Sequence, residues 1–214
     1  MPPSEHVPPT LLAAGDERLA PSRDPERARE RLTSATWSDA ARDAERVRIL
    51  ELLDAHGASL ADRGTLAGHL TGSALVVDAQ GEHVLMMFHR KLQRWLQPGG
   101  HADGDHELAG VALREATEET GIDGLRVLLP AVDVDVHEIP ARGDMPSHLH
   151  LDLRFVVVAP PGAEPRGNDE SEALRWVTPE ELAALADEPG VVRLAERGLD
   201  AYRTRVLGRD DAVS

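Results

Sequence analysis

The chain of 214 residues contains no cysteine and few aromatic side chains. Without cysteine it can form no disulfide, no thiolate nucleophile and no zinc–thiolate site. Aromatic residues make up 3% of the sequence, so few rings are available to stack on a nucleobase. No apolar run approaches the ~18 residues of a membrane span, and residues 1–6 lack the basic start and apolar core of a signal peptide. These absences predict a cytoplasmic protein.

Positive charge is also scarce. The formal net charge is −15 at pH 7, and Lys91 is the single lysine. This balance argues against a general affinity for nucleic acids or anionic membranes. It does not exclude phosphorylated substrates, because a bound divalent metal reverses the local field. The length and the 41% hydrophobic content suit one well-packed globular domain with extensions.

The N-terminal third differs in composition from the rest. Residues 1–36 are rich in Pro, Glu, Arg and Ser without sustained periodicity, so we expect a mostly disordered segment with at most a short helix around 25–31. Apolar side chains then recur at helical spacing and predict a helix over 39–55, which Ser38 can cap and Gly57 can stop. We expect this helix to pack on the following domain or to cover part of its entrance.

From residue 71 onward the pattern turns to strands and later helices. Strands are predicted at 73–77, 84–89, 95–97, 125–129, 131–139, 148–159 and 175–177. Helices are predicted at 109–120, 179–186 and 191–207. Strands first, one helix in the middle, then further strands and helices indicate an α+β fold with a mixed sheet.

Three glutamates on the central predicted helix indicate a metal site. Glu115, Glu118 and Glu119 project from one side of a helix that Gly121 ends. Carboxylates so close repel one another unless a cation lies among them. Oxygen ligands suit Mg²⁺ or Mn²⁺, and Arg114 can pair with a carboxylate and hold it in position. The alternative interpretation is a solvated acidic helix face.

The stretch around these carboxylates resembles the Nudix box, the signature of hydrolases that cleave nucleoside-diphosphate-linked compounds with the help of magnesium. The family pattern is Gly, five residues, Glu, seven residues, Arg-Glu, an aliphatic residue, any residue, Glu-Glu, any residue, Gly, aliphatic. Counted from Gly100, this chain matches except at His106, which replaces the first glutamate, and at Ala116. That glutamate typically supports the box arginine or the metal shell. Asp105 or Glu107 could take its place if the loop is shifted by one residue.

The resemblance implies a Nudix-type α/β/α sandwich over residues 70–186. A disordered segment (1–36) and a helical extension (37–69) would precede this domain, and a C-terminal helix and tail (187–214) would follow it. The implied activity is metal-dependent hydrolysis of a diphosphate linkage in a nucleoside diphosphate derivative or a related small molecule. Metal-activated water would attack the phosphorus.

The resemblance also suggests roles for single residues. The Gly100 carbonyl joins Glu115, Glu118 and Glu119 as a ligand of Mg²⁺, or possibly of Mn²⁺. Arg114 orients the carboxylates. Glu115 is the first candidate for the general base, and the outside candidates are Glu170 and His150. A small basic cluster could contact substrate phosphate, unless its members are ordinary surface residues: Arg90, Lys91 and Arg94.

Two further groups carry potential chemistry. His148, His150 and Asp152 alternate with leucines, so a strand would place all three on one face. They could bind a metal, contact phosphate or take a proton, or they could form the polar outer face of a half-buried strand. Glu170 and Glu172 lie in a loop where relatives often supply a further carboxylate, and the alternative is an exposed acidic loop.

Two other functions remain to be weighed. A non-catalytic Nudix-fold metabolite sensor fits the loss of the first box glutamate, but it would not need the three retained carboxylates. An isoprenoid diphosphate isomerase of similar fold usually depends on a cysteine, which is missing here. The box is compatible with nucleoside triphosphates, ADP-ribose, dinucleotides or non-nucleotide diphosphates. A homodimer is possible.

Overall fold

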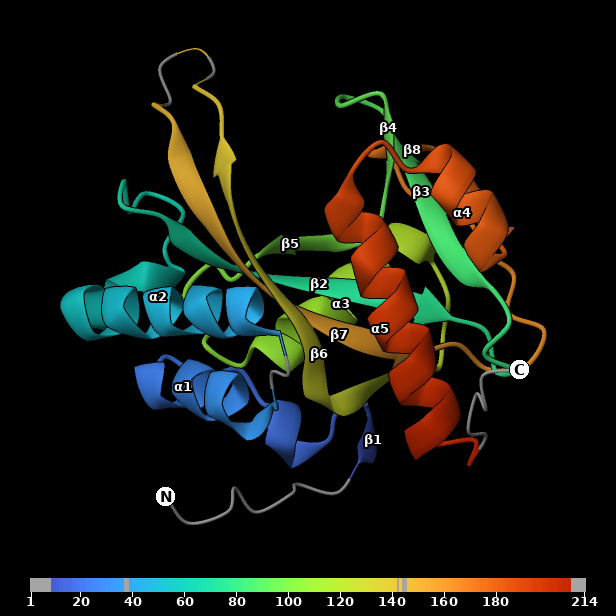
Figure 1. Ribbon diagram of the computed structural model, residues 1–214, viewed down its shortest axis with the longest axis horizontal. Helices are drawn as coiled ribbons and strands as arrows, with labels where there is room; N and C mark the ends of the chain where they lie inside the picture. Colours follow the sequence, from blue (N-terminus) through green and yellow to red (C-terminus); the bar gives the residue numbers. More distant parts are fainter. Residues whose placement is uncertain (1–8, 37–38, 142, 144–145, 209–214) are drawn as a thin grey trace.

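A mixed sheet of eight strands forms the framework of the computed structural model, which describes residues 9–36, 39–141, 143 and 146–208 (Figure 1). The strands are β1 (Thr10–Ala13), β2 (His69–Val77), β3 (Val84–His89), β4 (Arg94–Leu96), β5 (Gly99–His101), β6 (Arg126–Ile139), β7 (His148–Val158) and β8 (Ser171–Val177). The helices are α1 (Pro25–Ser34), α2 (Ala40–His56), α3 (Leu108–Thr120), α4 (Pro179–Leu185) and α5 (Pro189–Arg205), with short 3-10 turns η1 (Glu17–Leu19) and η2 (Gly57–Ala61). The α+β class predicted from the sequence is confirmed.

Strand β2 is the branching point of the sheet. The order is β1-β6-β7-β2-β3-β4, with β5 also paired to β2 and β8 to β3. Strands β2 and β7 run parallel, and the other pairs are antiparallel. Every residue of β2 is buried. Strand β5, which leads into helix α3, is positioned by its pairing with this buried strand.

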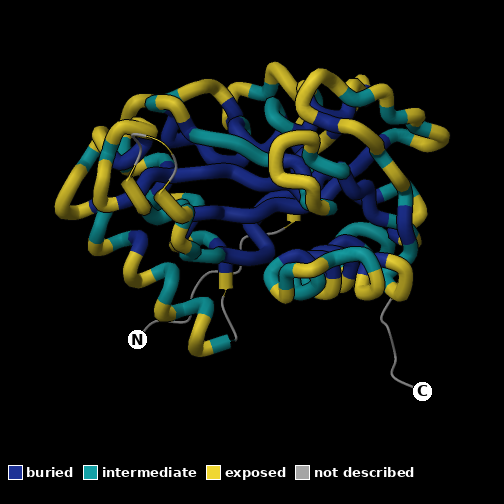
Figure 2. The backbone as a smooth tube through the Cα atoms, turned by 90° about the horizontal axis from the view of Figure 1, so that it is seen from above, coloured by how far each residue is buried: buried dark blue, intermediate teal, exposed yellow. Residues whose placement is uncertain are grey.

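Helices cover both faces of the sheet. Buried residues of α1, α2 and α3 share one hydrophobic core with alternate residues of β7, such as Leu151 and Leu153. Those of α4 and α5 share a second core with Val156 and Val158, which point the other way. In Figure 1, α5 crosses the near side of the sheet and α3 lies behind it. Figure 2 shows the buried strands running through the middle of the molecule, with exposed turns around them.

Helix α3 matches the predicted helix within one residue. It begins at Leu108 and ends at Gly121, whose left-handed conformation (φ 63°) closes the last turn by donating from its N–H to the Thr117 carbonyl. Its apolar side is buried in the first core, so the opposite side is left for polar residues. Glu115 and Glu118 lie on that side and are not part of the core.

The expected disorder of residues 1–36 is wrong over the described part, 9–36; residues 1–8 lie outside the described residues. Strand β1 pairs with β6, and α1 buries Ala28 and Leu32 completely. Arg31 of this helix binds the buried carboxylate of Glu107. A few apolar anchors and one ion pair thus order a segment whose average composition is polar.

Other expectations need smaller corrections. Helix α2 forms as predicted, but Asp39 caps it by accepting a hydrogen bond from the Ala41 N–H (2.8 Å), and Ser38 lies outside the described residues. Strand β6 continues through Pro130 as one strand with a shifted register, where two strands were expected. Strands β2 and β8 begin four residues earlier than predicted, because main-chain pairing with β7 and β3 extends them into polar sequence.

Among the described residues, no helix has the length and apolarity needed to cross a membrane.

Candidate functional site

An acidic cavity of about 280 Å³ lies between helix α3 and the loop that precedes β8. Helix α3 supplies three of the side chains around it, and the loop supplies three more. The lining residues are Glu115, Glu118, Glu119, Asn168, Asp169 and Glu170. The structure therefore brings together all three box glutamates and one of the two loop glutamates proposed from the sequence. Asn168 and Asp169 were missed, because nothing in the sequence pattern separates them from an ordinary loop.

Strand β5 forms the floor against which the carboxylates pack. A side chain at Gly100 would collide with the carboxylate of Glu115 and force it to move. The N–H of Gly99 donates to the Glu119 carboxylate (3.0 Å). The double-glycine turn thus places main-chain groups directly against two of the three box carboxylates.

Arg114 is held between two acidic residues. Its guanidinium donates to Glu115 (3.0 Å) and lies 3.8 Å from the carboxylate of Asp105. Asp105 also accepts hydrogen bonds from the N–H groups of Ser22 and Glu107 (both 2.9 Å). The loop before the helix therefore does supply an acidic neighbour for the box arginine, one residue before the position that the family pattern assigns.

The other two residues of that loop have different partners. His106, at the position of the first box glutamate, is completely buried, and its Nε2 lies 3.2 Å from the Ala58 carbonyl oxygen. Glu107 is completely buried too, where Arg31 of α1 binds it through two contacts of 2.8 Å. Both side chains hold the N-terminal segments against the start of α3, away from the cavity.

The carboxylates of the cavity are poorly compensated. Burial, opposed by the hydrogen bond from Gly99 and reinforced by the charges of Glu115, Glu170 and Glu118, raises the pKa of Glu119 to about 8. Burial also raises the pKa of Glu115, although the hydrogen bond from Arg114 opposes that shift. A divalent cation among these oxygens would remove the repulsion. The donor set, which is carboxylate with a nearby glycine carbonyl, is of the kind that Mg²⁺ and Mn²⁺ prefer.

The predicted phosphate-binding residues do not line the cavity. Arg90 is tied to the loop: its N–H donates to the Glu170 carbonyl (2.8 Å), and its guanidinium to the Ser171 carbonyl (3.2 Å). Arg94 forms an ion pair with Glu188 (2.7 Å), and Lys91 is exposed. Glu172, the second loop candidate, accepts a hydrogen bond from Gln93 (3.1 Å) and is also absent from the lining.

His150 lies on the other face of the sheet. Gly100 and its partner Gly72 face α3, whereas Thr71 and its partner His101 face the opposite way. His150 pairs with His69, which lies two residues before Thr71 and therefore shares its face. The structure thus separates His150 from the acidic cavity.

Asp152, the third polar residue of that alternating strand, belongs to a buried network. It accepts hydrogen bonds from Ser73 (2.9 Å) and Arg154 (2.7 Å). Arg154 also contacts the carboxylates of Asp133 (3.4 Å) and Asp135 (3.1 Å). Arg193 of α5 binds the same two aspartates. We call these residues the aspartate–arginine network: Asp133, Asp135, Asp152, Arg154 and Arg193.

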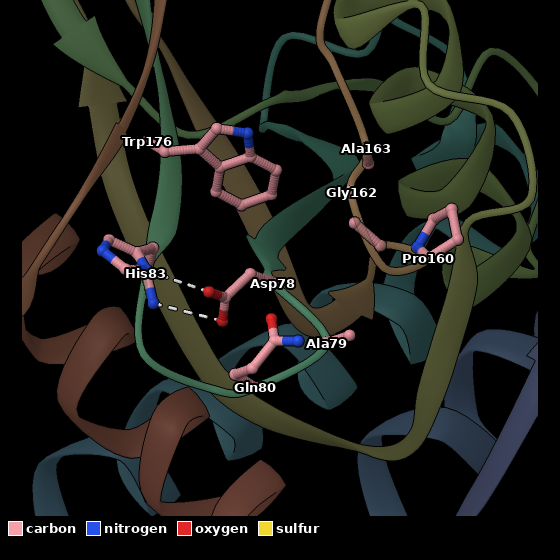
Figure 3. Close-up of a pocket in the computed structure, with 9 residues that line it drawn as sticks. Asp78, Ala79, Gln80, His83, Pro160, Gly162, Ala163 and Trp176 are labelled. Atoms are coloured by element: carbon pink, nitrogen blue, oxygen red, sulfur yellow. Dashed lines mark hydrogen bonds and ion pairs between the residues drawn. The ribbon is translucent and has the colours of Figure 1, made fainter.

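A second cavity of about 350 Å³ lies between the β2–β3 turn, the loop after β7 and Trp176 of β8 (Figure 3). Its lining contains no residue of the box. The two titratable groups in it, Asp78 and His83, are bonded to each other (2.9 Å). Because the three box glutamates meet in the acidic cavity, that cavity is the candidate active site.

Comparison with known proteins agrees with this assignment. The family model of the NUDIX domain matches residues 69–197, more than half of the chain, so the chain belongs to this family. Its fold is similar to that of a C. elegans Ap4A hydrolase in a binary complex, with a TM-score of 0.51, 16% identity and coverage of 65% of this chain and 98% of that one. It is also similar to the E. coli dihydroneopterin triphosphate pyrophosphohydrolase, with a TM-score of 0.50, 19% identity and coverage of 59% and 92%. Family membership supports a pyrophosphohydrolase.

Proposed function

We propose that this protein hydrolyses the diphosphate linkage of a nucleoside diphosphate derivative or a related small molecule, with Mg²⁺ or Mn²⁺ as cofactor. The observation that carries the proposal is the crowding of Glu115, Glu118, Glu119 and Glu170 around one cavity. Such crowding, with the raised pKa of Glu119, is unfavourable for the protein alone. A bound cation would offset the repulsion among these carboxylates and would also bind a phosphate group of the substrate.

Each residue has a proposed part. Glu115, Glu118, Glu119 and the Gly100 carbonyl hold the metal, which when bound polarises the phosphates and lowers the pKa of the attacking water. Arg114 orients the Glu115 carboxylate, to which it already donates a hydrogen bond. Asp105 orients Arg114 from its other side and takes the part of the missing first box glutamate.

The candidates for the general base line the cavity, whereas the candidates for phosphate contact lie outside its lining. Glu115 and Glu170 both line it and can accept a proton from water, whereas His150 faces away. Arg90, Lys91 and Arg94 follow β3 at the edge of the loop that bears Glu170, so they can contact the phosphate oxygens that the metal leaves free.

The experiment is a substrate panel with a matched control. Nucleotide and phosphate release is measured with nucleoside triphosphates, ADP-ribose, NADH, prenyl diphosphates and dinucleoside polyphosphates. Ap4A belongs in the panel because a protein of similar fold is an Ap4A hydrolase, and dihydroneopterin triphosphate for the corresponding reason. Each substrate is tested without metal, with Mg²⁺ and with Mn²⁺.

Glu119→Gln removes a proposed ligand and is expected to lower turnover by at least ~10²-fold, the scale of losing one electrostatic stabiliser. Glu51→Gln, the same change on an exposed position of α2, should leave turnover unchanged. Release that needs metal and fails only in Glu119→Gln supports the proposal. Equal turnover in both variants contradicts the metal assignment. Silence across the panel, with a metabolite still stabilising the fold, would favour the sensor.

A further inference from the structure

Five histidines gather on the face of the sheet opposite α3. The pairing of β7 with its two neighbours sets His150 beside His69 of β2 and beside His137 of β6. His101 of β5 lies on the same face, with its ring centroid 5.1 Å from that of His150 and 4.8 Å from that of His69. His148 stacks on His69 at 4.8 Å. Half of the histidines in the chain, five of ten, thus meet in one place.

The most deeply buried of these rings belongs to His69, and its polar atoms make no hydrogen bond among the described residues. His69 is 1% exposed, and both of its ring nitrogens are buried without a hydrogen-bond partner among the described residues. A buried polar group without a partner destabilises a fold by about 1–3 kcal/mol. Residues that carry such a group usually compensate for it with a water molecule, an ion or a function.

The donor atoms converge as a ligand set would. One ring nitrogen from each of His69, His101 and His150 lies within 4.8 Å of the other two. Nitrogen ligands of a tetrahedral zinc ion lie roughly 3.3 Å apart, given a Zn–N bond of about 2.0–2.1 Å. Binding would therefore require the imidazole rings to turn slightly toward one another.

The surroundings suit a cation held by neutral rings. His69 is buried and His150 is partly buried, and their neighbours include other histidines. His148 places its Nδ1 3.0 Å from the Pro146 carbonyl, the kind of bond that commonly orients a ligating histidine. Arg63, whose charge acts on His69 and His101, is paired with Asp103 (2.7 Å).

We propose that His69, His101 and His150 form a second metal site, specific for a first-row transition metal ion such as Zn²⁺ and distinct from the carboxylate site. Imidazole nitrogen suits Zn²⁺, Ni²⁺, Co²⁺ and Cu²⁺, whereas the box oxygens suit Mg²⁺. Three histidines leave a fourth position for water or for His148. The ion would link β2, β5 and β7, and it would fix His101 next to Gly100 of the acidic cavity. The proposal is independent of the hydrolase activity.

The test is metal binding by the full chain without an affinity tag, after treatment with a chelator. Calorimetric titration with Zn²⁺ should show one tight site per chain that excess Mg²⁺ does not displace. Co²⁺ should give the intense visible absorption of a four-coordinate ion, which an oxygen-ligated octahedral site does not give. His101→Ala and His150→Ala should each weaken Zn²⁺ binding by at least ~10–100-fold. These two positions are only partly buried, so the variants are expected to fold.

Two controls identify the site. His56→Ala removes an exposed histidine of α2 and should bind Zn²⁺ as the unaltered protein does. Glu119→Gln should also retain the tight Zn²⁺ site, which separates it from the carboxylates. Absence of a tight Zn²⁺ site in the unaltered protein would overturn the proposal. So would full affinity in both His101→Ala and His150→Ala with circular dichroism unchanged.

Discussion

Two clusters of carboxylates in this molecule differ in how their charges are compensated. In the aspartate–arginine network, burial alone would raise the pKa of Asp135, but the hydrogen bond from His137 and the charges of Arg154 and Arg193 lower it well below its usual range. In the acidic cavity, burial and the charges of neighbouring glutamates together raise the pKa of Glu119 to about 8. The first cluster is neutralised by arginines of its own chain, whereas the second is the one that we propose to bind a cation.

The arginine partners distinguish the acidic residues that stabilise the fold from those that we propose to bind a metal ion. Asp133 is fully buried and bound by arginines from both β7 and α5, so it joins the sheet to the helix above it. Glu118 and Glu119 have no such arginine at hydrogen-bond distance among the described residues. A sequence shows both sets simply as Asp and Glu; the partners distinguish them.

The largest effect is expected from breaking the compensated cluster. Arg154→Met leaves the carboxylates of Asp133 and Asp152 buried without their shared partner. Removing one member of a buried ion pair typically destabilises a protein by about 3–5 kcal/mol. The free energy of unfolding, measured in urea, should fall by this amount. Arg126→Met, at an exposed position of β6, is the matched control and should change it little. Equal stability of the two variants would mean that the network does not stabilise the fold.

The second prediction concerns the uncompensated cluster and its pH dependence. The pKa of Glu119 is about 8 in the folded chain against 4.5 for the unperturbed group. Between these values the folded state holds a proton that the unfolded state has released, so the metal-free protein should lose stability as the pH rises from about 4.5 to 8. The loss is at most a few kcal/mol. Glu119→Gln lacks this titration and should show a flatter profile.

Thermal unfolding with and without Mg²⁺ checks this second prediction. At pH 8, Mg²⁺ should recover the stability of the unaltered protein and have much less effect on Glu119→Gln. Glu51→Gln should follow the unaltered protein at every pH. Parallel pH profiles for all three proteins would show that Glu119 is not held in a proton-binding environment.

The third prediction concerns the departure from the family pattern. His106→Glu restores the family glutamate, but His106 is completely buried against the Ala58 carbonyl. A carboxylate there would face a carbonyl oxygen and lose the hydrogen bond, which we expect to destabilise the fold by about 1–3 kcal/mol without raising turnover. His106→Gln retains a donor and should be milder. A gain in activity from His106→Glu would show that the first box glutamate is needed after all.

Sequence patterns predicted an element correctly where the residues that determine it all lie in one short segment. Helix α3 and its carboxylate face follow from apolar periodicity and Gly121, and they appear within one residue of the prediction. The N-terminal segment was mispredicted because its order depends on distant partners. Leu32 is buried in a core that it shares with residues of α2, α3 and β6, and Arg31 is bound by Glu107, which is 76 residues away.

The candidate site was predictable to a similar extent. The three box glutamates have a local spacing, so they could be chosen from the sequence, and Glu170 was placed by the resemblance. The histidine cluster was only half visible: His148 and His150 alternate on one strand, but His69 and His101 reach them through pairing of β2 with β7 and with β5. No local pattern encodes such pairing, so the strand alone could not distinguish a ligand set from a polar outer face.

The smallest expected effect falls on the residue that replaces the missing box glutamate. Asp105 lies 3.8 Å from Arg114 and can position its guanidinium. It also accepts hydrogen bonds from the main-chain N–H groups of Ser22 and Glu107, which stabilise the fold. Asp105→Asn keeps an oxygen for the two N–H groups but removes the charge next to Arg114. We expect turnover to fall about 3–10-fold, as for the loss of about 1 kcal/mol, with KM nearly unchanged, because Arg114 orients a carboxylate and does not bind substrate. A fall in thermal stability with turnover per folded molecule unchanged would assign Asp105 to the fold alone. The acidic cavity would then function with Arg114 held by Glu115 only, and the loss of the first glutamate would be uncompensated.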